Sequence, residues 1–269
     1  MKNAITVDLE DWYQGVGIPV AEWGSYEKRL RIGFDKLMNL LEKHKVKATF
    51  FILGKVIEDH PDIIQEVIDA GHEIGCHGYS HLELFYMNKE EFDKEIQLCK
   101  ELIKPFNKEY TGYRAPYFSI DARSLWAIDV LKSHGFQYDS SIFPGDSKRT
   151  GIPGFRRDIH TLENGLVEVP LSTFKIGKMD FAIGGAYFRL LPYKYFARKL
   201  SQVNKKRPGI FYIHPWELDS EHPYLSFLSR RRRLPHYWFL DKTEKKLDQF
   251  LSDGEFVPLI NIVKNKTDE

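Results

Sequence analysis

Short apolar segments alternate with helical patterns over the first half of the sequence. Segments rich in β-branched and aromatic residues, typical of buried strands, cover residues 4–9, 46–53, 72–76, 110–114 and 136–138. Apolar residues at helical spacing separate them, over residues 30–41, 61–68, 92–103 and 125–131. Parallel strands need a crossover connection, usually a helix, so this alternation indicates a mostly parallel sheet. We therefore predict an α/β fold whose functional residues lie on the loops that follow the strands.

The second half of the chain has a looser pattern. After residue 143, glycines and prolines indicate a long loop, and strands are predicted over residues 166–171, 209–214 and 256–260. Asn88 with Glu91 predicts a capping box before the helix at 92–103, and Asp241 with Glu244 predicts another before a late helix. No internal repeat and no clear linker divides the 269 residues, so we predict one domain over residues 1–269.

Composition argues against several classes of protein. With 42% hydrophobic residues the chain can bury a sizeable core, and its net charge of +1 gives no general attraction to nucleic acid or anionic membranes. No segment approaches the roughly 18 apolar residues of a membrane-spanning helix. Cys76 and Cys99 form no C-x-x-C pair, and no apolar signal segment stands at the start. We therefore expect a protein of the reducing cytoplasm.

Polar residues able to bind a metal follow two of the predicted strands. His77 and His81 stand four residues apart, a spacing at which two imidazoles can bind one ion, although ten histidines make the spacing alone a weak signal. Asp8, Glu10 and Asp11 end the first strand, and they are either catalytic groups or an acidic turn. Both sets are expected at the same edge of the sheet.

The sequence resembles the polysaccharide deacetylase family in five motifs that occur in the family's order. They are TVD at residues 6–8 with two further carboxylates, HGYSH at 77–81, RAPY at 114–117, YDSS at 138–141 and IHP at 213–215. The motifs lie within residues 4–217. The segments VDLEDWY, GYRAPYFS, YDSSIFP, GGAYFRLLP and FYIHPWEL are most similar to the branch associated with bacterial exopolysaccharide biosynthesis, which has an added C-terminal region, here about residues 143–269.

The resemblance implies a fold, an activity and a mechanism. The fold would be a distorted (β/α) barrel, also called the NodB-homology fold, and the activity metal-dependent removal of acetyl groups from N-acetylated sugars of a polysaccharide or its precursor. Asp8 would be the general base that takes a proton from water, and Arg114 the arginine that pairs with it. His214 would be the general acid that protonates the leaving amine, with Asp139 a candidate for orienting it.

Further residues would hold the metal and the acetyl group. His77, His81 and a carboxylate would hold a divalent ion, most simply zinc. The backbone N–H of Tyr117 would help to stabilise the oxyanion. The fourth motif lacks the tryptophan that usually follows its aspartates, so Trp216 or Phe118 is expected to form the wall of the acetyl pocket.

The first motif departs from the family pattern, in which two adjacent aspartates serve as base and metal ligand. Here Leu9 follows Asp8. Either Glu10 or Asp11 therefore supplies the ligand, or these two replace the pair and Asp8 only lies nearby. We favour Asp8 as the base and place Asp11 slightly ahead of Glu10 as the ligand.

Two alternatives and one charged segment remain open. The same fold could hydrolyse a non-sugar amide such as a ureide, imide or formamide, or the chain could be an inactive carbohydrate-binding relic. The run Arg230–Arg233 is either a solvated face or a site for an anionic substrate or lipid-linked precursor.

Overall fold

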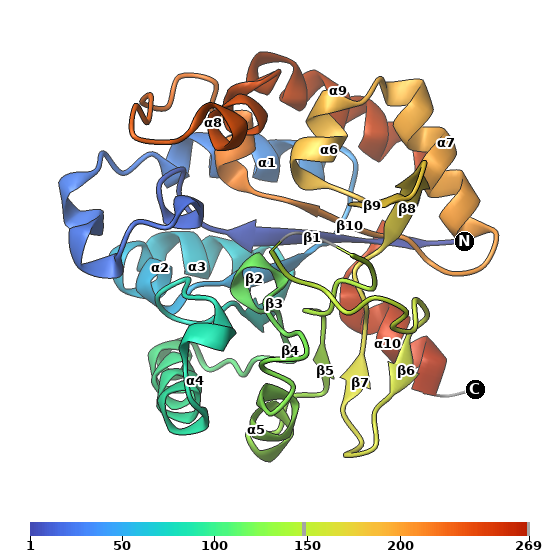
Figure 1. The fold of residues 1–269 in the computed structure, drawn as a ribbon. Coiled ribbons are helices and arrows are strands. Elements are labelled where there is room, and N and C mark those ends of the chain that lie inside the picture. Colours follow the sequence, from blue (N-terminus) through green and yellow to red (C-terminus); the bar gives the residue numbers. More distant parts are fainter. Residues whose placement is uncertain (147–148, 268–269) are drawn as a thin grey trace.

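The computed structural model describes residues 1–146 and 149–267, and its centre is a nine-stranded sheet curled into a half-barrel (Figure 1). The sheet consists of β1 (Asn3–Leu9), β2 (Thr49–Ile52), β3 (Glu73–Cys76), β4 (Gly112–Tyr113), β5 (Tyr138–Asp139), β6 (His160–Thr161), β7 (Val167–Glu168), β10 (Ile210–Ile213) and β11 (Phe256–Val257). Its order is β10-β1-β2-β3-β4-β5-β7-β6, with β11 paired to β1. Every pairing in this sheet is parallel except that of β6 with β7, so the predicted mostly parallel barrel is confirmed.

Helices cover the outside of the curled sheet (Figure 1). They are α1 (Leu30–Lys43), α2 (Gly54–Asp59), α3 (Pro61–Asp69), α4 (Lys89–Ile103), α5 (Ala127–Ser133), α6 (Gly185–Leu190), α7 (Tyr193–Asn204), α8 (Arg230–Tyr237), α9 (Leu240–Asp253) and α10 (Leu259–Thr267). A separate hairpin, β8 (Thr173–Ile176) with β9 (Met179–Ala182), precedes α6, and the short 3-10 helix η6 (Pro215–Leu218) follows β10. No helix among the described residues is long and apolar enough to cross a membrane.

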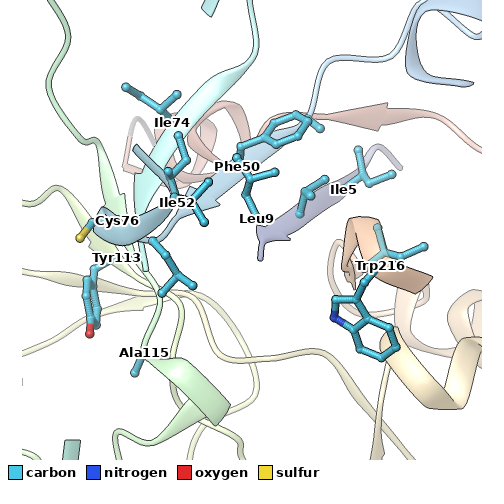
Figure 2. Packing of buried hydrophobic residues seen from close by; sticks show 14 of the residues in the cluster. Ile5, Leu9, Phe50, Ile52, Ile74, Cys76, Tyr113, Ala115 and Trp216 are labelled. Atoms are coloured by element: carbon cyan, nitrogen blue, oxygen red, sulfur yellow. The ribbon is translucent and has the colours of Figure 1, made fainter. Parts of the chain in front are cut away.

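The core lies between the sheet and these helices (Figure 2). All seven residues of β1 are buried, as expected for a central parallel strand with both faces covered. Helix α1 approaches η6 so closely that a Cβ on Gly33 would lie 2.0 Å from the carbonyl oxygen of Pro215. Glycine at this position therefore lets α1 pack against the segment that follows β10.

The C-terminal half of the chain completes the sheet. Strand β10 pairs with β1 in parallel, from Ala4 opposite Ile210 to Val7 opposite Ile213. Asp8, near the end of β1, and His214, directly after β10, therefore lie at the same edge of the sheet. This register brings a residue from the end of the chain beside the carboxylates of its beginning.

One predicted capping box is confirmed and the other is wrong. Asn88 Oδ1 accepts from the backbone N–H of Glu91 at 2.9 Å, and the backbone N–H of Asn88 donates to Glu91 Oε2 at 2.9 Å. Asp241 does not cap its helix. Helix α9 begins one residue earlier, at Leu240, after Phe239 turns the chain with a left-handed φ of 58°.

The predicted strand over residues 256–260 is also wrong in its second half. Strand β11 ends at Val257, and α10 begins at Leu259. The first N–H groups of a helix need acceptors from outside it, and side chains of the sheet supply them. Leu259 N–H donates to Thr49 Oγ1 at 2.7 Å, and Ile260 N–H donates to Glu73 Oε2 at 2.9 Å. The apolar face of α10 then packs against the start of β1.

Candidate active site

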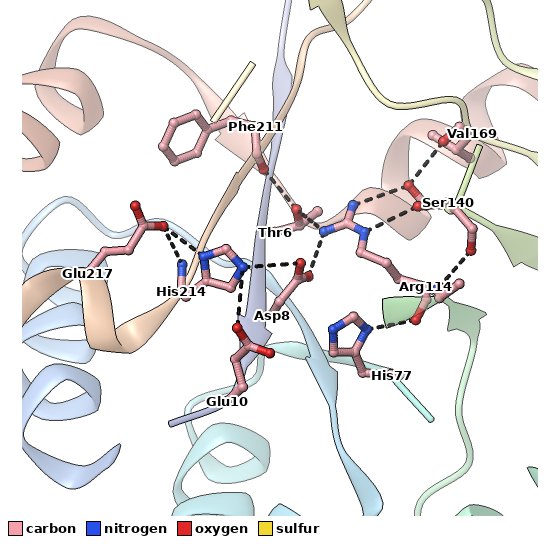
Figure 3. A network of polar contacts seen from close by, with 12 residues as sticks. Thr6, Asp8, Glu10, His77, Arg114, Ser140, Val169, Phe211, His214 and Glu217 are labelled. Carbon is pink, nitrogen blue, oxygen red and sulfur yellow. Dashed lines mark hydrogen bonds and ion pairs between the residues drawn. The ribbon is translucent and has the colours of Figure 1, made fainter. Parts of the chain in front are cut away.

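Polar side chains from β1, β10 and the loops after β3 and β4 meet at the carboxyl edge of the sheet (Figure 3). They surround a cavity of about 410 Å³, which we call the central cavity. Its wall includes Asp8, Glu10, His77, His81, His214 and Trp216. All six residues were predicted for the site from the sequence. This is the position at which parallel α/β sheets place binding and catalytic groups.

Glu10, His77 and His81 form a cluster suited to a metal ion. One donor atom of each lies within 4.8 Å of the other two, all three residues are buried, and His81 Nε2 lies 2.7 Å from Glu10 Oε2. His77 Nδ1 donates to the carbonyl oxygen of Arg114 at 2.7 Å, which leaves Nε2 free to bind an ion. Two imidazoles and a carboxylate are a usual donor set for zinc, so these residues fit the predicted ion.

Electrostatics keep two members of this cluster, His77 and Glu10, in the protonation states that bind a metal. Burial lowers the pKa of His77 to about 4, so its ring is neutral at pH 7. Burial alone would raise the pKa of Glu10, but the neighbouring His81, His214 and His77 outweigh it and lower the pKa to about 2. The cluster therefore offers a carboxylate and a neutral imidazole without a prior loss of protons.

Glu95, which the sequence analysis did not identify, holds the loop that carries His81. Its carboxylate accepts from the backbone N–H of Tyr79 at 3.0 Å and from Ser80 Oγ at 3.2 Å. His81 itself has a left-handed φ of 55°, a strained conformation for a residue with a Cβ. These bonds from α4 help to keep the loop in the conformation that turns His81 toward Glu10.

The expectation that Asp11 lies beside the histidines ahead of Glu10 is wrong. Asp11 Oδ2 accepts from the backbone N–H groups of Arg29 at 2.8 Å and Leu30 at 3.0 Å, at the start of α1. Its Oδ1 accepts from the backbone N–H of Trp12 at 2.8 Å. Asp11 therefore satisfies N–H groups that α1 leaves unpaired, and burial raises its pKa to about 6. Glu10 is the carboxylate that faces the histidines.

Asp8 and Arg114 form a buried ion pair, as predicted. Arg114 Nη1 donates to Asp8 Oδ1 at 2.8 Å and to Thr6 Oγ1 at 2.7 Å. Arg114 is fully buried, and its other nitrogens donate to the carbonyl oxygen and the hydroxyl of Ser140, both at 3.2 Å (Figure 3). The guanidinium is thus held on three sides and fixes Asp8 Oδ1. The second oxygen, Oδ2, faces His214 Nε2 at 3.8 Å.

His214 is oriented by Glu217, not by Asp139, so that part of the prediction is wrong. Glu217 Oε1 accepts from His214 Nδ1 at 2.8 Å and from the backbone N–H of His214 at 3.1 Å. Its Oε2 accepts from Arg189 Nε at 2.6 Å. Burial alone would lower the pKa of His214, but Glu10, Glu217 and Asp8 raise it to about 9. His214 Nε2 therefore points into the cavity with its proton at neutral pH.

Asp139 has a structural role behind this site. Its Oδ1 accepts from Ser141 Oγ at 2.5 Å, and Ser141 Oγ in turn accepts from the backbone N–H of Ala115 at 2.8 Å. Asp139 is fully buried next to Glu168, and burial raises the pKa of both, to about 6 for Asp139. The pair helps to position the segment that carries Arg114. Neither carboxyl lines the central cavity.

The sequence did not point to Glu217 and Arg189 as site residues. The only sequence signal was the spacing H-x-x-E over residues 214–217, which is also a capping box across η6. Glu217 is completely buried, and Arg189 lowers its pKa to about 2 against the opposing effect of burial. A residue of α6, which the sequence analysis did not predict as a helix, thus completes the chain Arg189–Glu217–His214.

Tyr117, Phe118 and Trp216 all line the central cavity, so both residues that the sequence offered for its wall, Trp216 and Phe118, lie there. Trp216 Nε1 donates to Glu10 Oε1 at 3.2 Å, and its ring stacks on His214 at a centroid distance of 5.3 Å. Tyr117 has a left-handed φ of 56° and packs against His81, and Phe118 also lies in the wall. Trp216 therefore forms part of the cavity wall and also fixes Glu10.

Comparison with known families supports the resemblance seen in the sequence. A family model described as polysaccharide deacetylase matches residues 30–138, and one described as a domain of unknown function (DUF3473) matches residues 140–264. A peptidoglycan deacetylase of Helicobacter pylori is 35% identical over 116 residues, 43% of this chain and 39% of that protein. A chitooligosaccharide deacetylase of Rhizobium leguminosarum bv. trifolii is 32% identical over 95 residues, 32% of this chain and 44% of that protein. The chain spans less than half the length of these relatives.

Solved structures share the fold over nearly the whole chain. A protein assigned to the polysaccharide deacetylases, from Mycobacterium smegmatis, superposes with a TM-score of 0.62 at 19% identity, covering 98% of this chain and 90% of that one. A peptidoglycan deacetylase of Bacillus subtilis gives 0.53 at 15% identity, with 99% and 92% coverage. A pseudoenzyme of the same fold, from Bacillus anthracis, gives 0.52 at 13% identity, with 97% and 64% coverage. Residues 30–138 of this chain therefore match the polysaccharide deacetylase family, in agreement with the motifs and the fold described above.

Proposed function

We propose that this protein is a metal-dependent hydrolase that removes acetyl groups from N-acetylated sugars of a polysaccharide or its precursor. The observation that carries the proposal is the meeting of three sets of groups in one cavity. They are the metal-binding cluster of Glu10, His77 and His81, the ion pair of Asp8 with Arg114, and His214 on Glu217. Amide hydrolysis needs an activated water, a base and an acid, and each set can supply one of them.

The ion, for which we propose zinc, would polarise the acetyl carbonyl and lower the pKa of the attacking water when bound. Asp8 then takes the proton of that water. Its Oδ1 is occupied by Arg114, so Oδ2 is the oxygen available to act as the base. Because Thr6 Oγ1 and Ser140 also accept from this arginine, the guanidinium stays in place, and Asp8 cannot rotate away from the cavity without breaking its own bond to it.

His214 completes the reaction as the general acid. An amine leaves the tetrahedral intermediate readily only when its nitrogen is protonated, and His214 Nε2 carries a proton into the same cavity. Glu217 holds Nδ1, so Nε2 is the nitrogen that faces the substrate. The raised pKa, about 9, keeps the acid charged at neutral pH. In the same proposal, the backbone N–H of Tyr117 helps to stabilise the oxyanion, and Trp216 forms the wall of the acetyl pocket.

Acetate release from chitotetraose and from peptidoglycan fragments, with zinc and with a chelator, tests the activity. Metal content of His77→Ala and His81→Ala tests the site independently of activity, with His160→Ala on the distant β6 as the control. Both site variants should lose most of the bound metal, and the control should retain it. If both site variants keep stoichiometric metal, the ion binds elsewhere and the proposal fails.

The same measurements separate the two alternatives. Hydrolysis of a ureide, imide or formamide without release of acetate from any sugar would identify a hydrolase of non-sugar amides. A protein that binds chitotetraose but releases no acetate at any metal loading would be an inactive carbohydrate-binding relic, as the pseudoenzyme among the structural neighbours makes worth testing. A part in exopolysaccharide biosynthesis, and a cytoplasmic location, remain proposals from the sequence.

A further inference from the structure

A second cavity, which we call the α8 cavity, adjoins the central cavity beneath α8. Its volume is about 340 Å³. The two cavities share part of their walls, including Tyr117, Arg149, His214 and Trp216. A substrate whose acetamido group occupies the central cavity would therefore extend its neighbouring unit into the α8 cavity.

We propose that the α8 cavity binds an anionic group, a carboxylate or a phosphate ester, on the unit next to the acetylated sugar. The proposal rests on the function proposed above and narrows its substrate to an acidic N-acetylated saccharide. Two independent observations carry it. One is an excess of positive charge at the cavity wall, and the other is a buried imidazole there that lacks a hydrogen-bond partner.

The positive charge comes from Arg232 on α8. Arg232 is exposed and lines the cavity, and its guanidinium makes no ion pair with an acidic side chain within residues 1–146 and 149–267. The carboxylate in the same wall, Glu217, is already neutralised by Arg189 and His214. Arg149, also in the wall, lies over the ring of Tyr117 and forms an ion pair with Glu83, so the uncompensated positive charge is that of Arg232. An arginine with free donors is the side chain best matched to a carboxylate or a phosphate.

The unpartnered imidazole is that of His236, one turn along α8 from Arg232. The residue is only 8% exposed, and its Nε2 has no hydrogen-bond partner among the described residues. A buried polar atom left without a partner is destabilising, so its retention points to a ligand that completes it. Burial lowers the pKa of His236 to about 3, and a neutral ring can bond a sugar hydroxyl. The His236 ring also stacks on Trp216 at a centroid distance of 4.5 Å, and Trp216 in turn donates to Glu10 in the central cavity.

Steady-state kinetics with three N-acetylated probes test the proposal. Chitotetraose is neutral, a hyaluronan tetrasaccharide carries uronate carboxylates, and UDP-N-acetylglucosamine carries a diphosphate. We expect at least one acidic probe to have a lower KM than the neutral one. Arg232→Glu should raise the ratio of acidic to neutral KM at least about tenfold, the worth of one charged hydrogen bond. Arg231→Glu, on the same exposed helix but outside both cavity walls, makes the same change of charge and should leave the ratio within about twofold.

The identity of the affected probe distinguishes the two sources of charge. If Arg232→Glu raises the KM of the hyaluronan probe alone, the anionic group is a carboxylate in a polymer. If it raises the KM of UDP-N-acetylglucosamine alone, the group is the diphosphate of a precursor. Equal KM values for all three probes in the wild type, or equal effects of Arg231→Glu and Arg232→Glu, would overturn the proposal. If no probe is deacetylated, calorimetric binding of the same probes decides separately. If an acidic probe binds and Arg232→Glu abolishes that binding, the anion-binding role of the α8 cavity is supported and the deacetylase activity is refuted. If no acidic probe binds, both the anion-binding role and the activity are refuted.

Discussion

Glu217→Gln is the substitution that tests the active-site geometry most directly. It keeps the size of the side chain and the oxygen that can accept from His214, and it removes the charge. In the native protein that charge is shared between two partners, His214 Nδ1 at 2.8 Å and Arg189 Nε at 2.6 Å. The substitution should therefore change stability through Arg189 and acid strength through His214.

The effect on stability follows from burial. The side chains of Arg189 and Glu217 are each 1% exposed, so removing the carboxylate leaves a buried guanidinium charge without its counterion. Breaking a buried pair in this way costs about 3–5 kcal/mol. For a domain of this size each kcal/mol lowers the melting temperature by about 2–4 °C, so we expect a fall of about 6–20 °C.

The effect on His214 follows from its raised pKa. A group with a raised pKa is protonated below that value and loses its proton as the pH rises through it. For His214 this happens at about 9 in the native protein. Removal of a carboxylate in contact with an imidazole lowers its pKa by about 1–3, so in the variant the proton should be lost between about pH 6 and 8. The alkaline limb of kcat/KM should move to lower pH, and kcat at pH 8 should fall by about twofold to about a hundredfold, in proportion to the protonated fraction of His214.

Stability should also change with pH in opposite directions for the two groups. Glu217 has a lowered pKa, about 2, so its contribution is present above its ordinary value of 4.5 and is lost as the pH falls toward 2. His214 has a raised pKa, so its contribution is present below its ordinary value of 6.5 and is lost as the pH rises through about 9. Both losses should be smaller in Glu217→Gln.

Calorimetric unfolding from pH 3 to 10, NMR titration of the histidines in metal-free protein and the pH dependence of kcat/KM measure these effects. Asp139→Asn is the matched control, because Asp139 is equally buried and was predicted from the sequence to orient His214. It should leave the titration of His214 in place. The reasoning is refuted if Asp139→Asn moves the alkaline limb and Glu217→Gln does not.

Three further predictions concern the carboxylates and the packing. Glu10→Gln should lose most of the bound metal, whereas Asp11→Asn should keep it and lose stability, since the carboxylate of Asp11 accepts from backbone N–H groups at the start of α1; metal analysis with thermal unfolding checks both. Asp8→Asn should keep the metal and lose about two to four orders of magnitude in rate, and loss of the ion instead would make Asp8 a ligand. Gly33→Ala should cost at least about 1–3 kcal/mol, because its Cβ would lie 2.0 Å from a carbonyl oxygen of η6. Gly24→Ala, where a Cβ meets nothing within 4 Å, is the control in thermal unfolding.

Local patterns in the sequence determined the elements whose signals are local. The apolar run that forms β1, the helical spacing that forms α1 and the capping box of Asn88 with Glu91 all depend on neighbours within one or two turns. The motif positions were sufficient to bring Asp8, His77, His81, Arg114 and His214 to one edge, because parallel strands end at the same side of a sheet.

Only the tertiary structure decided which neighbouring residue takes each role. Glu10 and Asp11 are adjacent in the sequence, and the choice between them depends on α1, whose first N–H groups lie where Asp11 can reach them. Glu217 and not Asp139 meets His214, because η6 turns back beside β10 and Arg189 arrives from α6 to balance the charge. Likewise, an apolar stretch that reads as a strand becomes α10, since Thr49 and Glu73 of the sheet accept the N–H groups of Leu259 and Ile260. These choices depend on partners 18 residues away for Asp11, 28 for Glu217 and 210 for Leu259, whose positions no local spacing can specify.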